Sequence, residues 1–523
     1  MTVTDLHRGV YLADLLIAAL DANLNKPAVH IGDEVLTGAQ MRDEISKYAQ
    51  ALGELGITKG SPLSVLSANR PEVIFNMGAT MITGCRTTPL HPLGSLDDHA
   101  YVMNDAGIET LVYDPAVFGG RAAELKEKVP GLKNLLAFGD DEIGTNYLAL
   151  AAKHTPQKLV AAEVQPTDVS GLIYTGGTTG KPKGVMSSYR SSATMTQIQM
   201  AEWEWPVDLR FLIMTPLSHA GAAFIIPTLL RGGSIVVSAG FDPAKLFQLI
   251  EKYKITATML VPTMLYMLMD HPGFADADLS SLQTVYYGAA AASPTRLKEA
   301  IDKLGPIFFQ FFGQSECPMS ISVLRKAEHD VTDLDRLATC GRPVPWVHVK
   351  LLDDDNNEVA PGEPGEICVQ GPLVMEGYWN KPEETEAAFA GGWLHTGDVA
   401  RADKDGFMTI VDRKKDMIVS GGFNLYPREI EDVISSHPAV GAVAVIGVPD
   451  ARWGEAVKAV VVLRPDQKVD PEELMAMVKD KKGSAHAPKS VDFVDAIPVS
   501  ALGKPDKKAL RAQYWGDAAR QVN

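Results

Sequence analysis

The sequence predicts an α/β protein that has a large N-terminal domain and a small, mobile C-terminal α/β domain. Short β-rich runs alternate with longer helical stretches over residues 33–240, which is typical of βαβ units with parallel sheets. After about Cys340 short strands alternate with turn residues, so a β-rich subdomain is expected there. A second compact α/β pattern begins at Asp412. We therefore predict domains at 1–411 and 412–523, with a hinge at Asp412.

Each element is predicted from the type and the spacing of its hydrophobic residues. Runs of β-branched and aromatic residues predict strands in the N-terminal domain at 63–67, 110–113, 234–238, 257–261, 284–287 and 308–312. Amphipathic stretches predict helices there at 38–55, 71–83, 96–107, 245–254, 262–270 and 296–304. The β-rich subdomain has expected strands at 348–352 and 366–369. In the C-terminal domain we expect helices at 427–436 and 471–482, and strands at 442–446, 456–463 and 490–494. No low-complexity linker joins the domains, which favours a hinge over a flexible tether.

The composition excludes several classes of protein. A chain of 523 residues is too long for one hydrophobic core, and 46% hydrophobic with 22% charged residues is typical of a folded globular protein. The net charge of -16 argues against a nucleic-acid partner and against an anionic membrane surface. No apolar run reaches the roughly 18 residues that a membrane span needs, so no integral membrane association is expected.

The four cysteines lie far apart in the sequence and have no metal-ligand spacing, which fits a reducing compartment. The N-terminus has no basic segment followed by an apolar core, so we expect no secretory signal peptide. We therefore predict a cytoplasmic protein. The sequence leaves its oligomeric state open, a homodimer included.

A glycine-rich stretch at 174–186 follows the strand-like run 169–174 and contains four glycines, three threonines and two lysines. Glycines let backbone N–H groups converge on phosphate oxygens, and lysines add positive charge. A Walker A loop is excluded, because Thr175 and Pro182 occupy positions where that loop needs glycine and a hydroxyl residue. The alternatives are therefore another kind of phosphate-binding loop or an ordinary flexible surface loop.

Two further stretches end in a carboxylate. Residues 310–316 form a strand end that leads to Glu316, which could hold Mg²⁺, and Phe311 or Phe312 could stack on a base. Residues 392–398 place Asp398 after a tight turn, where it could accept hydrogen bonds from ribose hydroxyls. An ordinary loop acid and core aromatic rings would explain either stretch taken alone.

The last two stretches lie at and beyond the expected hinge. Residues 412–431 combine crowded charges with Gly421 and Gly422, which would let the backbone pass close to a thin ligand. A solvated turn would explain the charges but not the paired glycines. Residues 498–504 end in Lys504, and a lysine after a glycine near a C-terminus is usually a solvated surface residue.

In this order and spacing, the stretches 174–186, 312–316, 394–398, 412–431 and 498–504 resemble the motifs of the AMP-forming acyl-CoA synthetases. The superfamily of these enzymes also includes adenylation domains of peptide synthetases and beetle luciferases. The resemblance covers residues 33–511. It implies a ligase that uses ATP, Mg²⁺ and CoA to convert a carboxylic acid first to an acyl-adenylate and then to an acyl-CoA thioester.

The resemblance also implies roles for individual residues. Lys504 would be the catalytic lysine of adenylation, with Thr178 and Glu316 near Mg²⁺. Gly421 and Gly422 would line the CoA channel, and Asp412 would be the hinge. The implied ATP and AMP contacts are Thr175, Gly176, Gly177, Thr178, Thr179, Gly180, Lys183, Gly288, Ala289, Ala290, Phe311, Phe312, Gly313, Gln314, Ser315, Asp398, Arg413 and Lys504. Among these, Gly288 to Ala290 and Phe312 would enclose adenine, while Asp398 and Arg413 would bind ribose.

Residues 215–224 match the acid-pocket motif of the family around His219, with Ser218 where an aromatic residue is usual. No acidic residue lies between 218 and 227, so an amino-acid substrate is not expected, because its ammonium would be buried without a partner. The small residues implied in the pocket suggest a roomy cavity, although close packing would explain them equally well. The implied pocket residues are His219, Gly221, Ala222, Ala290, Pro318 and Met319.

A bulky apolar acid is therefore expected, with a preference for an aromatic or hydroxycinnamic acid and a medium- or long-chain fatty acid as the alternative. An enzyme that loads a carrier protein and a silent adenylate-binding regulator are the rivals from other classes. Intact Lys504, Glu316 and Asp398 argue against the regulator. Lys481, Lys482 and Lys489 are candidates for the CoA 3′-phosphate, with a solvated lysine face as the alternative.

Overall fold

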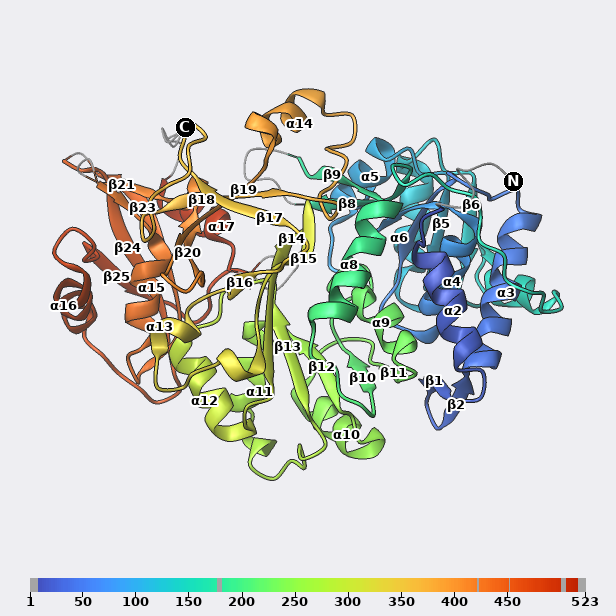
Figure 1. The fold of residues 1–523 in the computed structure, drawn as a ribbon, viewed down its shortest axis with the longest axis horizontal. Helices are drawn as coiled ribbons and strands as arrows, with labels where there is room; N and C mark the ends of the chain where they lie inside the picture. The colour runs from blue at the N-terminus through green and yellow to red at the C-terminus, as the bar shows by residue number, and fades with distance from the viewer. Residues whose placement is uncertain (1–7, 176–180, 421–422, 451, 500–504, 516–523) are drawn as a thin grey trace.

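The computed structural model describes residues 8–175, 181–420, 423–450, 452–499 and 505–515. Within these residues the strands form four sheets, of seven, nine, four and five strands. Figure 1 shows the N-terminal elements in blue at one side of the molecule and the elements after residue 412 in orange and red at the opposite side. The predicted α/β class is confirmed, and the last sheet is built entirely from residues beyond 412.

The seven-stranded sheet has the order β7-β6-β5-β3-β4-β8-β9. Its strands are β3 (Pro62–Leu66), β4 (Arg86–Pro89), β5 (Thr110–Tyr113), β6 (Asn134–Ala137), β7 (Thr145–Asn146), β8 (Val169–Thr175) and β9 (Lys183–Ser188). The helices between them are α4 (Pro71–Thr83), α5 (Leu96–Asp105), α6 (Pro115–Lys128) and α7 (Tyr147–Ala152). All neighbours are parallel except β8 and β9, which form an antiparallel hairpin at the edge.

The nine-stranded sheet has the order β16-β15-β14-β13-β12-β10-β11-β1-β2. Its strands are β1 (Pro27–Ile31), β2 (Glu34–Thr37), β10 (Arg210–Ile213), β11 (Ser234–Val237), β12 (Ala257–Leu260), β13 (Thr284–Gly288), β14 (Phe308–Gln314), β15 (Cys317–Leu324) and β16 (Arg342–Pro343). Its central strands are parallel, as predicted, whereas β2, β15 and β16 add antiparallel edges. The associated helices are α2 (Leu12–Ala22), α3 (Gly38–Glu54), α8 (Tyr189–Glu202), α9 (Ile225–Leu230), α10 (Pro243–Tyr253), α11 (Pro262–Asp270), α12 (Pro294–Leu304) and α13 (Leu334–Leu337).

Helices α8 and α9 lie between the two large sheets (Figure 1), and the largest apolar core joins residues of both sheets around them. The hydrophobic pattern does not predict α8. Its buried positions include Ser191, Thr196 and Gln199, so no continuous apolar stripe marks the helix.

The four-stranded antiparallel sheet follows, in the order β17-β18-β19-β20. It consists of β17 (His348–Leu352), β18 (Gly365–Gln370), β19 (Leu394–Ala402) and β20 (Met408–Arg413), with α14 (Pro382–Ala388) beside it. This is the β-rich region that the turn-rich sequence after Cys340 predicts.

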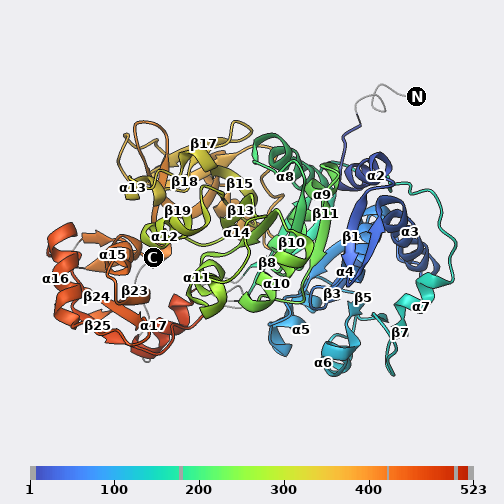
Figure 2. The same cartoon turned by 90° about the horizontal axis from the view of Figure 1, so that it is seen from below.

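The last sheet consists of β21 (Ile418–Ser420), β22 (Phe423–Leu425), β23 (Val440–Asp450), β24 (Gly454–Leu463) and β25 (Ser490–Phe493). Helices α15 (Pro427–Ser435), α16 (Pro471–Lys482) and α17 (Lys507–Trp515) accompany it, and Figure 2 shows them grouped at one end of the molecule. This sheet has an apolar core of its own around Ile430, Val445 and Val461. A domain boundary at Asp412 stays a prediction.

None of the helices in the described ranges is long and apolar enough to cross a bilayer. All four cysteines of the chain are free and buried.

Candidate active site

The β8–β9 hairpin carries the glycine-rich stretch. Thr175 pairs with Lys183 at the open ends of the two strands, so the chain leaves and re-enters the sheet at one point. Gly176, Gly177, Thr178, Thr179 and Gly180 lie outside the described residues. The two lysines that follow lie over aromatic rings: Lys181 Nζ is 5.0 Å from the Tyr101 ring centroid and Lys183 Nζ is 5.0 Å from that of Tyr378. The hairpin thus directs two positive charges toward one edge of the sheet.

Tyr378 connects this hairpin to Glu316. Its hydroxyl donates a hydrogen bond to Glu316 Oε1 at 2.8 Å, and the Glu316 side chain is buried. The segment around Tyr378 is fixed on β9, because Tyr378 bridges to Val185 and Trp379 N donates to Gly184 O at 2.8 Å. Burial and the nearby Glu316 carboxylate raise the pKa of Tyr378, so the hydroxyl stays protonated and remains a donor. Sequence reasoning missed Tyr378, because nothing local distinguishes it from other tyrosines of the chain.

The end of β13 lies beside the middle of β14, so Gly288 and the two phenylalanines that the sequence offers for the base are neighbours. Gly288 is paired with Phe311, and a Cβ at Gly288 would lie 2.4 Å from Phe311 O, so only glycine fits there. Ala289 has φ +62°, a left-handed conformation that turns the chain away from the strand. Ala290 follows it in the same turn.

Of the two rings considered for stacking on a base, that of Phe311 faces the interior of the protein. This side chain is only 4% exposed and stacks on Trp203, with ring centroids 4.9 Å apart. It therefore belongs to the aromatic core, because successive side chains of a strand point to opposite faces. Phe312 is only partly buried and is the remaining candidate for stacking on a base.

The predicted Gly313 and Gln314 are the last two residues of β14, and Ser315 begins the turn that leads to β15. A Cβ at Gly313 would lie 2.3 Å from Met319 N, so the close approach of β15 requires glycine at this position. Gln314 Nε2 donates to Thr396 O at 3.1 Å. This hydrogen bond brings two of the predicted motifs, 312–316 and 394–398, into direct contact.

Asp398 and Arg413 are cross-strand neighbours on β19 and β20, and Arg413 Nε lies 3.0 Å from Asp398 Oδ1. Asp398 is 5% exposed, whereas the Arg413 side chain is 44% exposed. The Asp398 carboxylate raises the pKa of Arg413. The structure therefore brings together the two residues that the resemblance assigns to ribose.

The predicted tight turn before Asp398 is wrong, because residues 394–398 belong to the strand β19, in which Gly397 has φ +72°. Glu366, which sequence reasoning also missed, supports this part of β19. Its Oε1 accepts a hydrogen bond from Gly397 N at 2.8 Å, and its Oε2 lies 3.0 Å from His395 Nδ1 and 3.4 Å from Lys414 Nζ. Cys368 Sγ lies 3.4 Å from the same His395 nitrogen. Glu366, Cys368 and His395 lie close enough together to resemble a set of metal ligands. Because the Lys414 ammonium already supplies a positive charge beside Glu366, we interpret this cluster as support for β19 and not as a metal site.

The acid-pocket stretch 215–224 follows β10 and is held by Asn69. The Asn69 amide donates to Thr215 O at 2.9 Å and accepts from Leu217 N at 2.8 Å, so the loops after β3 and β10 are joined across the two large sheets. His219 precedes the short helix η1 (Ala220–Phe224) and lies edge-on to His91, with centroids 4.9 Å apart. Ser218 Oγ is 2.9 Å from His219 Nδ1.

The small pocket residues have different reasons for their size. A Cβ at Gly221 would lie 2.5 Å from Thr215 O, so close backbone packing requires glycine there. Ala222 is partly buried in η1, and Pro318 is partly buried at the start of β15. Met319 has φ +59°, and its Sδ lies 3.9 Å from Gln199 Nε2 of α8. For Gly221, the small size is thus explained by contact with the loop after β10, and its role in an acid pocket stays a prediction.

At the expected hinge, the Asp412 carboxylate is buried and accepts hydrogen bonds from Arg413 N at 2.7 Å and Arg428 N at 3.1 Å. Burial raises its pKa. The predicted Gly421, Gly422 and Lys504 lie outside the described residues.

The three lysines considered for the CoA phosphate have different surroundings. Lys482 Nζ lies 3.4 Å from Glu429 Oε1, and Lys489 Nζ lies 5.8 Å from the Trp453 ring centroid. Lys481 is exposed at the end of α16. The contacts described for these lysines therefore have no partner in common.

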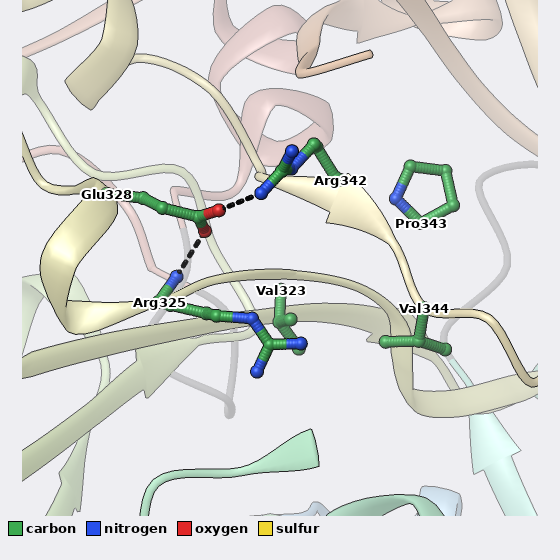
Figure 3. Close-up of a pocket in the computed structure, with 6 residues that line it drawn as sticks. All are labelled: Val323, Arg325, Glu328, Arg342, Pro343 and Val344. Atoms are coloured by element: carbon green, nitrogen blue, oxygen red, sulfur yellow. Dashed lines mark hydrogen bonds and ion pairs between the residues drawn. The ribbon is translucent and has the colours of Figure 1, made fainter. Parts of the chain in front are cut away.

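A cavity of about 250 Å³ lies between β15 and β16, where Glu328 is bonded to Arg342 and to Arg325 N (Figure 3). A second cavity of about 580 Å³ shares Pro343 and Val344 with it and extends to Trp393. Neither cavity is lined by any of the described residues predicted for the nucleotide or the acid.

Comparison with known proteins agrees with these motifs. Residues 18–379 match the family described as AMP-binding enzyme, and residues 429–504 match the AMP-binding enzyme C-terminal domain. The medium/long-chain-fatty-acid–CoA ligase FadD8 of Mycobacterium tuberculosis is 55% identical over 521 residues, which cover 97% of this chain and 91% of that protein. Feruloyl-CoA synthase of an Amycolatopsis species is 35% identical over 491 residues, with 93% and 96% covered.

Solved structures show the same fold. Amide bond synthetase McbA from Marinactinospora thermotolerans superposes with a TM-score of 0.88 at 35% identity, covering 96% of this chain and 100% of that chain. Family, relatives and fold therefore agree over nearly the whole length. The chain belongs to the AMP-binding enzyme family of adenylate-forming proteins, and it is an AMP-forming acyl-CoA ligase.

Proposed function

We propose that this ligase activates medium- or long-chain fatty acids. The observation that carries the proposal is the 55% identity with the fatty-acid ligase FadD8 over 97% of the chain, against 35% with feruloyl-CoA synthase. This evidence favours the fatty-acid alternative over the aromatic acid that the small pocket residues suggested. The lack of acidic residues between 218 and 227 agrees with an uncharged acyl chain.

For the nucleotide, we propose that the hairpin ends at Thr175 and Lys183, with residues 176–180 between them, bind the ATP phosphates. Adenine would lie between the 288–290 turn and Phe312, and ribose against Asp398 and Arg413. The support is that Thr175 ends β8, Gly288 ends β13 and Phe312 lies near the end of β14. In addition, Arg413 at the end of β20 is paired with Asp398 of β19 at 3.0 Å.

The proposed metal ligands are Glu316 and Thr178. A buried carboxylate beside the phosphate-binding hairpin has the hard oxygen donors that suit Mg²⁺, so the residues present fit this ion. Mg²⁺, when bound, would neutralise charge on the ATP phosphates. Tyr378 would hold Glu316 in orientation through its 2.8 Å hydrogen bond.

In the proposed reaction, an oxygen of the fatty-acid carboxylate attacks the α-phosphorus of ATP and pyrophosphate leaves. Two anions approach each other in this step, so the Lys504 ammonium is needed to offset the developing charge. In the second step the CoA thiolate attacks the acyl carbon. The bond between this carbon and the oxygen of the AMP phosphate breaks, and AMP leaves. Gly421 and Gly422 would line the CoA channel, and rotation of residues 412–523 about Asp412 would exchange the groups between the steps. We also propose a cytoplasmic location, which agrees with four free cysteines.

A substrate panel tests the assignment. Pyrophosphate release would be measured with octanoate, decanoate, laurate and palmitate, and with coumarate, ferulate and benzoate, while acyl-CoA is identified by mass spectrometry. We expect kcat/KM to be highest for a fatty acid and the product to be its CoA thioester. Turnover of ferulate or coumarate without turnover of any fatty acid would overturn the substrate class.

The same assay separates the rivals. Adenylate formation without a CoA thioester would indicate an enzyme that loads a carrier protein. Absence of adenylate with every acid, despite ATP binding, would indicate a regulator. As a catalytic control, Lys504→Ala should abolish pyrophosphate release more strongly than it slows thioester formation from supplied acyl-adenylate.

A further inference from the structure

Lys507 is the first residue of α17, the helix that follows the Lys504 segment. Its Nζ is 2.8 Å from Glu431 Oε1 on α15 and 3.8 Å from Asp412 Oδ2 on β20. The three side chains are largely buried, with 16%, 19% and 7% exposure for Lys507, Glu431 and Asp412. Buried opposite charges interact more strongly than exposed ones, because water screens them less.

Both carboxylates are themselves fixed. Asp412 accepts the backbone N–H groups of Arg413 and Arg428, and Glu431 Oε1 accepts Val445 N at 2.7 Å. Burial alone would lower the pKa of Lys507, but the neighbouring carboxylates outweigh it and raise the pKa. The ammonium is therefore held charged between two carboxylates that cannot easily turn away.

Backbone contacts join the described residues on the two sides of 500–504. Asp506 N donates to Pro498 O at 2.7 Å, and Val499 bridges to Pro505. These contacts close the chain on either side of residues 500–504. Asp506 Oδ1 accepts Ala509 N at 2.9 Å, which caps the helix that begins at Lys507.

A second ion pair fixes the same helix one turn later. Arg511 Nη2 lies 2.9 Å from Asp416 Oδ1, just beyond the hinge. Residues 507 and 511 are four apart and thus lie on one face of α17. That face is directed at the hinge, while Lys508 is exposed.

We propose that Lys507 is a positioning residue that ties the Lys504 segment to the hinge carboxylate of Asp412. The inference rests on the proposed role of Lys504. Lys507 would then fix the start of α17, three residues after Lys504 in the sequence, relative to the hinge. It would act on adenylation through the chain that it holds and not by touching the reacting groups.

The first test is kinetic. Lys507→Met keeps the length of the side chain and removes its charge, and it should lower kcat for pyrophosphate release about 10- to 100-fold with little change in the KM for ATP. Conversion of supplied acyl-adenylate to acyl-CoA should fall much less. Lys507→Arg should restore most of the adenylation rate, and Lys508→Met, on the exposed face, should behave like wild type. Equal losses in both half-reactions would overturn the proposal.

A double-mutant cycle tests the partner. The double variant Asp412→Asn/Lys507→Met should lose less adenylation activity than the product of the two single losses predicts. Each single variant leaves one buried charge without its counterpart, whereas the double variant removes both charges. Purely multiplicative effects would show that the two residues act independently, which contradicts the proposal.

Hydrogen exchange followed by mass spectrometry gives a readout that does not need activity. In Lys507→Met, amides of residues 505–515 and of the peptide around Asp412 should exchange faster, and amides of the nine-stranded sheet should not. Unchanged exchange at the hinge would overturn the coupling even if Lys504 is essential. Faster exchange in an enzyme that activates no acid would leave the coupling intact and refute the proposed function instead.

Discussion

At the scale of single residues, the hydroxyl of Tyr378 donates a hydrogen bond to Glu316. Replacing Tyr378 by Phe keeps the ring beneath Lys183 and removes only the 2.8 Å hydrogen bond to the carboxylate. Groups that orient a metal ligand typically change metal affinity 10- to 100-fold. We therefore expect the Mg²⁺ concentration for half-maximal pyrophosphate release to rise about 10-fold.

Tyr101→Phe is the matched control, because Tyr101 also lies under a lysine of the same hairpin, Lys181. Its Mg²⁺ dependence should equal that of wild type. An unchanged Mg²⁺ titration for Tyr378→Phe would mean that Glu316 keeps its orientation without the hydroxyl, or does not bind the metal.

His329 links the stability of the N-terminal region to pH. Its Nε2 lies 2.9 Å from the Tyr287 hydroxyl and its Nδ1 lies 2.8 Å from Arg325 O, and burial lowers its pKa to about 4 from the ordinary 6.5. The unfolded chain thus binds this proton at a higher pH than the folded chain. The contribution to the free energy of unfolding is complete above about pH 6.5 and is lost as the pH falls toward 4, by about 2 kcal/mol between pH 7 and pH 5.

Urea unfolding at pH 7 and pH 5 measures this contribution. The loss on acidification should be smaller in His329→Gln than in wild type, and His348→Gln, at an exposed position, should match wild type. The same acid-dependent loss in His329→Gln would assign the effect to other groups.

At the scale of elements, Asn69 joins the loop after β3 to the loop after β10. Asn69→Ala would leave Thr215 O and Leu217 N without their partner inside the protein, at a cost of about 1–3 kcal/mol for each buried group. We expect the 215–219 loop to shift, so that the KM for the acid rises several-fold while the KM for ATP changes little. Steady-state kinetics with each substrate varied measures the split.

Asn76→Ala is a suitable control. Asn76 is 1% exposed in α4, and its amide has no hydrogen-bond partner among the residues described. Losing it should leave the KM for the acid unchanged. If Asn69→Ala also left both KM values unchanged, the hydrogen bonds of Asn69 would not determine the shape of the acid pocket.

Elements that carry a motif at a strand end could be predicted from the sequence, because glycines and carboxylates after a β-rich run are a local signal. Tyr378, Glu366 and Asn69 could not, because they reach the site only through contacts with distant segments. Phe311 and Phe312 show a second limit. A central strand is covered on both faces, so adjacent aromatic residues do not reveal which one faces the core. Only the packing of Phe311 on Trp203 distinguishes them.

At the scale of the whole molecule, the first part of the chain and residues beyond 412 meet at Ser293 and Ser435. Ser293 precedes α12, Ser435 ends α15, and their Oγ atoms are 3.2 Å apart. Arg428 reinforces this contact by donating to Ala292 O at 3.2 Å. A disulfide between cysteines at the two serine positions would therefore hold the present arrangement of the two parts.

If the two half-reactions need different arrangements, the oxidised Ser293→Cys/Ser435→Cys protein should retain one of them and lose the other at least 10-fold, and a reducing agent should restore both. The native cysteines are buried, so mild oxidation should act on the new pair, and each single cysteine variant serves as a control. Pyrophosphate release and conversion of supplied acyl-adenylate are measured separately on the oxidised protein. The half-reaction that survives identifies the arrangement described here, whereas full conversion of acid to acyl-CoA by the cross-linked protein would exclude rotation about Asp412 as a step of the cycle.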